Sequence, residues 1–507
     1  MIPAADNDRF AQLQARLAPL FRDVFADPRA PRTVVVIPGL SMDQEIISHV
    51  QGLSHYEERQ LTLLMLLRLP NTRIVFVTST PIDPVIVDYY LSLLPGIPHQ
   101  QAQRRLTMLS AYHGSAITLT RKILDRPRLI ARIRAAIGDT ASAHMSCFNA
   151  TEDEKQLALQ LDIPLYACDP ALSWLGGKSG SRAMFRAAGI ELPPGSEDLC
   201  DANDIIAALT KLRTDNPTLS RAAVKLNDGA SGEGNSAFRF DGAPDAASAG
   251  TDALQRWIRD ALPSKLAFEA DGENWEHYLH KFSTMRGIVE AWITGSGTCS
   301  PSAQQRVTPI GTIEMISTHD QVLGGSTGQK FLGSTFPALP GYRLAIQEST
   351  RRVGLELCKR GVLGRYGVDF VSFRQADGTW RNVAIEINVR TGGTTHTFQT
   401  LQYLTNGQYD PATGEFRIPN GECRCYYATD NLQAAALKRL IPEDLIDIAV
   451  ENDLHFDQSS MQGVTFNLIG ALAEFGKLGV VSIAATPEDA MQRYRKTVQV
   501  LSDVAAS

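Results

Sequence analysis

Two strands that flank a short turn near residue 377 constrain the fold more than any other feature of this sequence. The segments GVDFVSFR (367–374) and RNVAIEINVR (381–390) are rich in apolar residues, and Asp-Gly lies in the turn between them. This pattern predicts a β-hairpin. Asp369 lies in the first strand. Glu386 and Asn388 share one face of the second strand, because side chains alternate between faces along a strand.

The polar face of this hairpin predicts a cation site. Two carboxylates and an amide oxygen suit Mg²⁺ that is held together with substrate phosphates. Ile385 and Ile387 are then expected to face the core. Arg390 lies one step further along the polar face, where a guanidinium would neutralise a phosphate or an oxyanion. Taken alone, an ordinary hairpin with a solvent-facing polar side explains these residues equally well.

A glycine-rich stretch, VKLNDGASGEGN (224–235), follows a predicted strand at 222–226. Lys225 would contact phosphate oxygens as a point charge, and the glycines would let backbone N–H groups approach an anion. The order of glycines, G-x-x-G-x-G with strands on both sides, does not fit a dinucleotide-binding fingerprint. A plain hairpin loop remains the alternative interpretation.

A second lysine lies in GGKS (176–179). A P-loop would require glycine at position 172, which is Leu172, and a strand leading directly into the loop. Both are missing from the sequence pattern. Lys178 is therefore interpreted as a phosphate lysine ahead of a helix.

The order of predicted elements gives the fold class. An amphipathic helix is expected over 1–30, and buried strands over 33–40 and 73–80 alternate with helices, which favours an α/β layer with parallel strands. Residues 294–304 are expected to form a loop, and a helix is expected over 342–360.

Composition narrows the function classes. Among 507 residues, 49 Lys and Arg against 55 Asp and Glu give a formal charge of −6, which argues against a nucleic-acid scaffold. The seven cysteines contain no CxxC, so a disulfide framework or a cysteine zinc site is not expected. No signal peptide or membrane-length apolar run is evident, and a cytoplasmic location is expected.

Five motifs follow one another in a single order. They are Lys178, K-L-N-D-G-x-x-G-E-G (225–234), E-A-W-I (290–293), GVDF (367–370) and E-I-N-V-R (386–390). Over residues 174–402 this order resembles the ATP-grasp superfamily. The flanking segments, such as VVVIPGLSMD and STHDQVLGG, resemble the pheganomycin-type peptide ligases.

The resemblance implies a mixed α/β and α+β fold in three parts. Residues 1–170 would form a Rossmann-like pre-ATP-grasp domain, 171–405 the ATP-grasp nucleotide-binding and catalytic domain, and 406–507 a small family-specific α+β domain. It also implies ATP and Mg²⁺ as cofactors.

The resemblance assigns roles to individual residues. Lys178 and Lys225 would bind ATP phosphates, Asp369, Glu386 and Asn388 would hold Mg²⁺, and Arg390 would lie near the transferred phosphoryl group, with Lys225 and Asn388 also counted as catalytic. The glycine-rich loop would close over the phosphates through Gly229, Ser231, Gly232, Glu233 and Gly234. The strand Glu290–Ile293, with Trp292, would present its main chain to adenine. Many relatives carry an acid just after this strand to hold ribose, but TGSGT (294–298) has none.

Five further residues are substrate-contact candidates. His319 and Gln321 lie near a Gly-Gly turn, and a turn that merely caps a strand is the alternative. Lys330 would be a third phosphate contact. His396 would line the acceptor side, although a lone histidine is more often structural. Arg306 would bind a substrate carboxylate, against a surface role.

The resemblance implies a ligase that joins a small-molecule carboxylate to an amino-acid or peptide amine through an acyl phosphate, releasing ADP and phosphate. Two alternatives remain open: an ATP-grasp enzyme that uses another acceptor, and a non-catalytic ATP-binding regulator. Neither nucleic acid nor membrane is expected as a partner, and a homodimer is left open.

Overall fold

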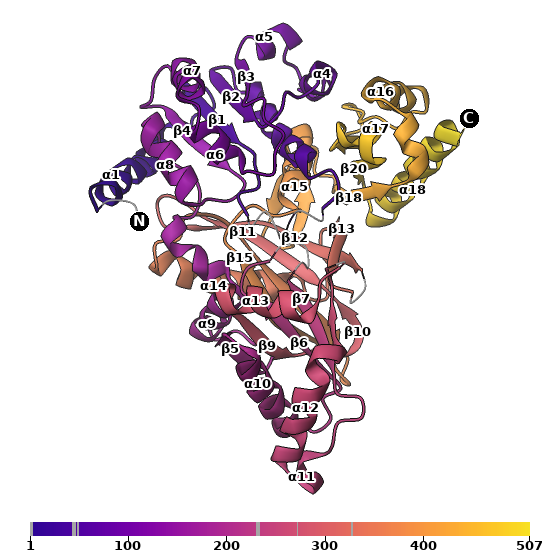
Figure 1. The fold of residues 1–507 in the computed structure, drawn as a ribbon. Helices are drawn as coiled ribbons and strands as arrows, with labels where there is room; N and C mark the ends of the chain where they lie inside the picture. Colours follow the sequence, from indigo (N-terminus) through magenta and orange to yellow (C-terminus); the bar gives the residue numbers. More distant parts are fainter. Residues whose placement is uncertain are drawn as a thin grey trace.

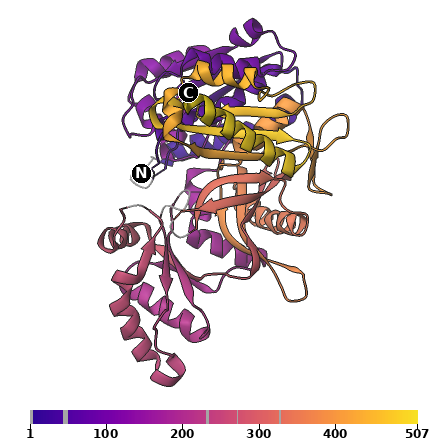
Figure 2. The same ribbon diagram turned by 90° about the vertical axis from the view of Figure 1, so that its right-hand side faces the viewer.

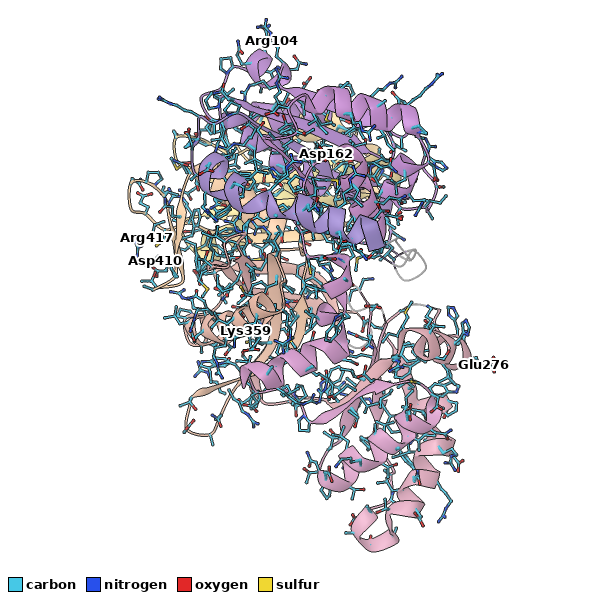
Figure 3. All side chains as sticks on the ribbon, turned by 90° about the vertical axis from the view of Figure 1, so that its left-hand side faces the viewer. Arg104, Asp162, Glu276, Lys359, Asp410 and Arg417 are labelled. Atoms are coloured by element: carbon cyan, nitrogen blue, oxygen red, sulfur yellow. The ribbon has the colours of Figure 1, made fainter. Side chains whose placement is uncertain are left out.

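The chain is built from layers of sheets and helices, shown from two directions in Figures 1 and 2. The computed structural model describes residues 4–42, 47, 50–229, 234–270, 272–325 and 328–506. A helix-covered parallel sheet and the C-terminal helices lie at one end, a broad sheet lies in the middle, and a narrow lobe lies at the other end. Figure 3 labels Arg104 and Asp162 in the first layer and Glu276 on the distant lobe.

The first layer is a parallel sheet with the order β3-β2-β1-β4, as the sequence predicts. Its central strands consist mainly of buried β-branched residues, as expected for strands covered on both faces. The strands are β1 (Arg32–Ile37), β2 (Thr72–Thr78), β3 (Leu106–Ser110) and β4 (Ala143–Cys147). The helices are the 3-10 helix η2 (Leu53–Arg68), α4 (Pro84–Ser92), α5 (His99–Gln103), α6 (Leu119–Leu124), α7 (Pro127–Ile137) and α8 (Glu152–Leu161).

The prediction of one continuous helix over 1–30 is wrong. The segment consists of α1 (Ala4–Ala15), α2 (Leu17–Pro19) and the π-helix η1 (Leu20–Phe25). Pro19 explains the interruption, because proline has no N–H and its ring crowds the preceding turn. The apolar stripe still packs inward, since Phe10, Leu13 and Leu17 are buried.

The distant lobe is an antiparallel sheet with the order β5-β9-β6-β7-β8. Its strands are β5 (Gly195–Leu199), β6 (Arg221–Leu226), β7 (Asn235–Arg239), β8 (Leu266–Phe268) and β9 (Gly287–Ala291). The helices of the lobe are α10 (Ala202–Asp215), α11 (Ala246–Ala249), α12 (Thr251–Lys265) and α13 (Trp275–Met285). The predicted strand at 222–226 lies beside β9 here, which brings Lys225 next to the strand that carries Glu290.

The middle layer is a sheet with the order β10-β14-β11-β12-β13-β18-β20-β19, and β15 pairs with β14. Its first strands are β10 (Ser296–Cys299), β11 (Pro301–Val307), β12 (Ile313–Gly324), β13 (Lys330–Phe336), β14 (Gly364–Arg374) and β15 (Trp380–Asn388). The 3-10 helix η3 (Pro170–Gly176) leads into α9 (Lys178–Ala188), which packs with α14 (Arg343–Lys359) against one face of the sheet. The predicted helix and hairpin are confirmed, whereas the loop expected at 294–304 is wrong, because these residues pair with β14.

The C-terminal region continues the same sheet. Helix α15 (Thr395–Thr405) follows β15, and the remaining elements are β16 (Gln408–Asp410), β17 (Glu415–Arg417), β18 (Cys425–Gln433), η4 (Ala435–Arg439), α16 (Pro442–Glu451), β19 (Gly463–Asn467), α17 (Ala471–Phe475), β20 (Lys477–Ala484) and α18 (Pro487–Ala506). One apolar core joins side chains of the first layer to side chains of this region. Figure 2 shows the two regions at the same end of the molecule. The boundary at 405/406 thus lies within continuous packing, and the three-part division stays a prediction. None of the described helices is long and apolar enough to cross a membrane.

Candidate active site

The hairpin places Asp369 directly opposite Glu386. In the register of β14 and β15, Asp369 pairs with Glu386 and Gly367 with Asn388. A β-bulge follows, because Phe370 pairs with Ala384 and Ile385 is the extra residue. Ile387 is fully buried, as predicted, but Ile385 is only half-buried because the bulge interrupts the alternation.

Polar contacts fix the Asp369 carboxylate. The Gln321 side chain donates to its Oδ1 at 2.8 Å, and the Asn388 side chain donates to its Oδ2 at 3.3 Å. Glu386 instead accepts from Lys178, whose Nζ lies 2.5 Å from Oε1. Three segments that are distant in sequence therefore meet at this pair of carboxylates.

Burial and charge act in opposite directions on the two carboxylates. Burial raises the pKa of Asp369 above its usual range, and the charge of Glu386 raises it further. Burial would also raise the pKa of Glu386, but Lys178, Lys225 and Arg390 outweigh it and lower that pKa. A divalent cation at this point would relieve the repulsion between the carboxylates.

Asn227 and the start of α9 hold Lys178 in place. The backbone N–H of Lys178 donates to the Asn227 carbonyl at 3.1 Å. The N–H and hydroxyl of Ser179 donate to the Asn227 side-chain oxygen at 3.0 and 2.7 Å. Because Asn227 follows β6, these contacts connect the lobe to the first turn of α9.

Lys225 is buried and pairs with Glu290 across β6 and β9. Its Nζ lies 2.8 Å from Glu290 Oε1, while Arg182 Nη1 lies 3.0 Å from the other oxygen. Lys225 lies close enough to lower the pKa of Glu386. Its predicted contact with phosphate stays a prediction, because its ammonium is held here by Glu290.

A cavity of about 440 Å³ opens over the two carboxylates, and we name it the carboxylate cavity. It brings together most of the predicted phosphate, metal and acyl-substrate residues: Lys178, Gly229, Gln321, Lys330, Asp369, Glu386, Asn388 and Arg390. Arg390 also lies 5.7 Å from the centre of the Phe148 ring.

A second cavity of about 430 Å³ lies between the first layer and the middle sheet, and we name it the arginine cavity. Arg306 and His396, both predicted as substrate contacts, line this second cavity. The two cavities share wall residues, namely Arg59, Phe148, Arg390 and Gly392.

Other predicted site residues lie elsewhere. His319 is fully buried in the core, where its Nε2 lies 2.6 Å from the Tyr426 hydroxyl. The predicted contact of His319 with substrate is therefore wrong for this structure, because its side chain packs in the core and lines neither cavity. Trp292 and Ile293 follow the end of β9, and Trp292 stacks against Arg221 at 3.8 Å. Gly234 precedes β7, while Ser231, Gly232 and Glu233 lie outside the described residues.

The donor set at Asp369, Glu386 and Asn388 fits Mg²⁺. Within the described residues, no cluster of three or more His, Cys, Asp or Glu side chains could hold a metal. Two carboxylates and one amide leave room in an octahedral shell for water and phosphate oxygens, which is how Mg²⁺ is commonly bound. The residues therefore suit a metal that arrives with a phosphorylated ligand.

Family comparisons agree with this geometry. A family described as IQCH-like, ATP-grasp matches residues 170–240 and 254–412, which include both strands of the hairpin and Lys178. This part of the chain belongs to the ATP-grasp superfamily. A second family, described as the PGM1 C-terminal domain, matches residues 444–497. The predicted family and fold class are confirmed.

The chain also has relatives along its whole length. It is 27% identical over 481 residues to L-propargylglycine–L-glutamate ligase of Streptantibioticus cattleyicolor, covering 92% of this chain and 94% of that protein. It is 21% identical to IQ motif-containing protein H of Danio rerio, covering 93% of this chain but only 48% of that protein, so it spans about half of its length. The structure of a Campylobacter jejuni biotin carboxylase complex, 11% identical, covers 94% of this chain and 95% of that chain with a TM-score of 0.53.

Sequence reasoning missed several residues around the ATP-grasp site. Arg59 and Phe148 come from the first layer, and Asp430 and Lys477 come from the C-terminal region, yet all four line the carboxylate cavity. Burial lowers the pKa of Lys477 to about 8. The signal for Arg59 is a charged residue at the start of the apolar stretch of η2. Lys477 has no comparable signal, because only the pairing of β18 with β20 brings it to the site.

Proposed function

We propose that the protein is an ATP-dependent ligase that joins a carboxylate to an amine, forming an amide and releasing ADP and phosphate. The observation that carries the proposal is the facing pair Asp369 and Glu386, with Asn388 beside it and Lys178 and Arg390 lining the same cavity. This arrangement suits transfer of a phosphoryl group, which depends on positioning and on charge stabilisation rather than on a protein nucleophile.

The acidic residues hold the metal end of the site. Asp369, Glu386 and Asn388 would hold Mg²⁺, which supplies positive charge for the phosphate oxygens when bound. Gln321 and Asn388 orient Asp369 through hydrogen bonds, and Lys178 orients Glu386. The carboxylates thus keep fixed positions as the ligands that complete the shell arrive.

The basic residues serve the phosphates and the reacting carboxyl group. Lys178, Lys225 and Lys330 position the triphosphate, and Arg390 stabilises charge on the transferred phosphoryl group. The substrate carboxylate attacks the γ-phosphate to form an acyl phosphate, and the amine then displaces phosphate. Arg390 lines both cavities, so it lies where the acyl group and the amine would meet.

The substrate class follows from the relative that the chain matches over most of both lengths. The printed name of that ligase specifies two amino acids, L-propargylglycine and L-glutamate. We propose that this chain likewise joins small amino-acid-like substrates. A cytoplasmic location and a homodimeric state stay predictions.

The test is a hydroxylamine trap. Purified protein is incubated with Mg-ATP, hydroxylamine and single carboxylic acids, including the proteinogenic amino acids, and hydroxamate, ADP and AMP are measured. Hydroxamate with ADP supports the proposal and identifies the acid. AMP in place of ADP would mean adenylation and contradict it. ATP binding without any turnover would favour the regulator, and phosphorylation without hydroxamate would favour a different acceptor.

A further inference from the structure

The arginine cavity contains an unusual concentration of positive charge. Five arginines line it, Arg32, Arg59, Arg306, Arg365 and Arg390, and no Asp or Glu is among the described lining residues. Two of these arginines have acidic partners outside this cavity: Glu314 pairs with Arg306, and Asp430, which lines the carboxylate cavity, pairs with Arg59. Arg32 donates to backbone carbonyls, including that of Val24 at 2.6 Å.

Arg365 differs from the other four arginines in its partners. It lies directly opposite Arg306 in the register of β11 and β14. In the described part of the chain it has no ion-pair partner, and its buried Nη1 has no hydrogen-bond partner. Burial, together with the charge of Arg306, lowers the pKa of Arg365 to about 10. A half-buried guanidinium that has no ion-pair partner and lies opposite a second guanidinium is unfavourable unless an anion binds it.

The rest of the wall is apolar and aromatic. Phe21, Phe25, Leu63, Leu66, Phe148 and Tyr403 line the cavity. His144 adds a neutral donor or acceptor, because burial lowers its pKa to about 4, and its buried Nδ1 has no partner among the described residues. These surfaces suit the body of a small organic molecule, with the anion held at one end.

We propose that the arginine cavity binds the amine substrate, an α-amino acid with an apolar or aromatic side chain, and that Arg365 receives its free carboxylate. This inference rests on the proposed ligase function. The phosphate and metal residues face the carboxylate cavity, so the activated acyl group belongs there. The amine reaches it across the shared wall of Arg59, Phe148, Arg390 and Gly392. The excess of cations around the amine also favours its neutral, nucleophilic form.

The first test measures binding without turnover. Isothermal titration calorimetry compares the proteinogenic L-amino acids with their primary amides, which keep the amine and side chain but lose the negative charge. We expect at least one apolar or aromatic amino acid to bind, its amide to bind at least about tenfold more weakly, and Arg365→Gln to weaken the acid by a similar factor. Arg374→Gln is the matched control, because Arg374 lies at the exposed end of the same strand.

The outcomes separate cleanly. Equal binding of acid and amide to the wild type, or binding of none of the amino acids, would overturn the inference even if Arg365→Gln failed to fold. Arg365→Lys, which keeps the charge but not the forked geometry, should fall between wild type and Arg365→Gln.

A second readout distinguishes this inference from the ligase itself. Hydroxylamine replaces the amine substrate, so Arg365→Gln should form hydroxamate at the wild-type rate while its KM for the amino-acid acceptor rises at least about tenfold. Loss of hydroxamate in Arg365→Gln would place the acyl donor in this cavity and contradict the proposal. Amino-acid binding to a wild type that forms no hydroxamate would overturn the ligase and leave the carboxylate site standing.

Discussion

Strand β14 carries two pairs of like charges on one face. Asp369 lies opposite Glu386 of β15, and Arg365 lies opposite Arg306 of β11. Burial alternates along the strand, with Tyr366, Val368 and Phe370 in the core, while Arg365, Gly367 and Asp369 line the cavities. Four residues of strand separate the two pairs by about 13 Å.

The surroundings of the two pairs differ. Lys178 and Arg390 place positive charge near the acidic pair, and two side-chain amides donate hydrogen bonds to Asp369. Burial and the charge of Glu386 nevertheless raise the pKa of Asp369. Among the described residues, the only acidic partner of the basic pair is Glu314, which contacts Arg306. Like charges directly opposite each other destabilise a sheet, so each pair points to a missing ligand of the opposite charge. The first calls for a cation and the second for an anion.

The acidic pair gives the largest expected effect. Glu386→Gln removes one charge from the proposed metal site while keeping the shape and polarity of the side chain, so we expect the protein to fold and its ligase activity to fall at least about 100-fold. ADP release at varied Mg²⁺ concentration measures this. Glu276→Gln, on the exposed surface of α13 in the distant lobe (Figure 3), should leave activity unchanged. Wild-type turnover of Glu386→Gln would remove Glu386 from the metal site.

The acidic pair, Asp369 and Glu386, is predictable from the sequence, whereas only Arg306 of the basic pair is. The hairpin register follows from alternation and the Asp-Gly turn, so Asp369, Glu386 and Asn388 could be grouped in advance. The bulge at Ile385 could not be, because it depends on tertiary packing. Arg306 was a candidate, but Arg365 precedes the predicted start of its strand at 367, and its partner depends on β11, a segment partly predicted as loop.

The lysines test how the acidic pair is neutralised. We expect Lys178→Ala to weaken ADP binding about tenfold or more, because Lys178 lines the cavity and contacts Glu386. Lys225→Ala should weaken it less, since Glu290 holds the Lys225 ammonium. Calorimetric titration of Mg-ADP measures both, with the exposed Lys211→Ala as the control. Unchanged affinity in either variant would exclude that lysine from the phosphate site.

The buried His319 on β12 makes the free energy of unfolding depend on pH, independently of the two charged pairs. Burial lowers the pKa of His319 to about 3, against 6.5 in the unfolded chain, so the unfolded state binds more protons between these values. Stability is therefore lost as the pH falls from about 6.5 toward 3, at about 1.4 kcal/mol per pH unit well inside that window. The slope of unfolding free energy against pH should be shallower in His319→Gln by this amount. The exposed His280→Gln should keep the wild-type slope, and equal slopes for His319→Gln and wild type would mean that His319 is not buried as the neutral form.

Substitutions in the basic pair should change the free energy of unfolding only slightly, but in opposite directions. Without substrate, Arg365→Gln removes an unpaired guanidinium that faces Arg306, so we expect the free energy of unfolding to rise by about 0.2–1 kcal/mol. Arg306→Gln should do the opposite, because it leaves Glu314 without its partner. Urea denaturation of both variants measures the difference, and adding an amino acid that binds should reverse the order of Arg365→Gln and wild type. A ligand-free Arg365→Gln that is less stable than wild type would show that Arg365 is a structural residue, and the symmetry between the two pairs on β14 would then fail.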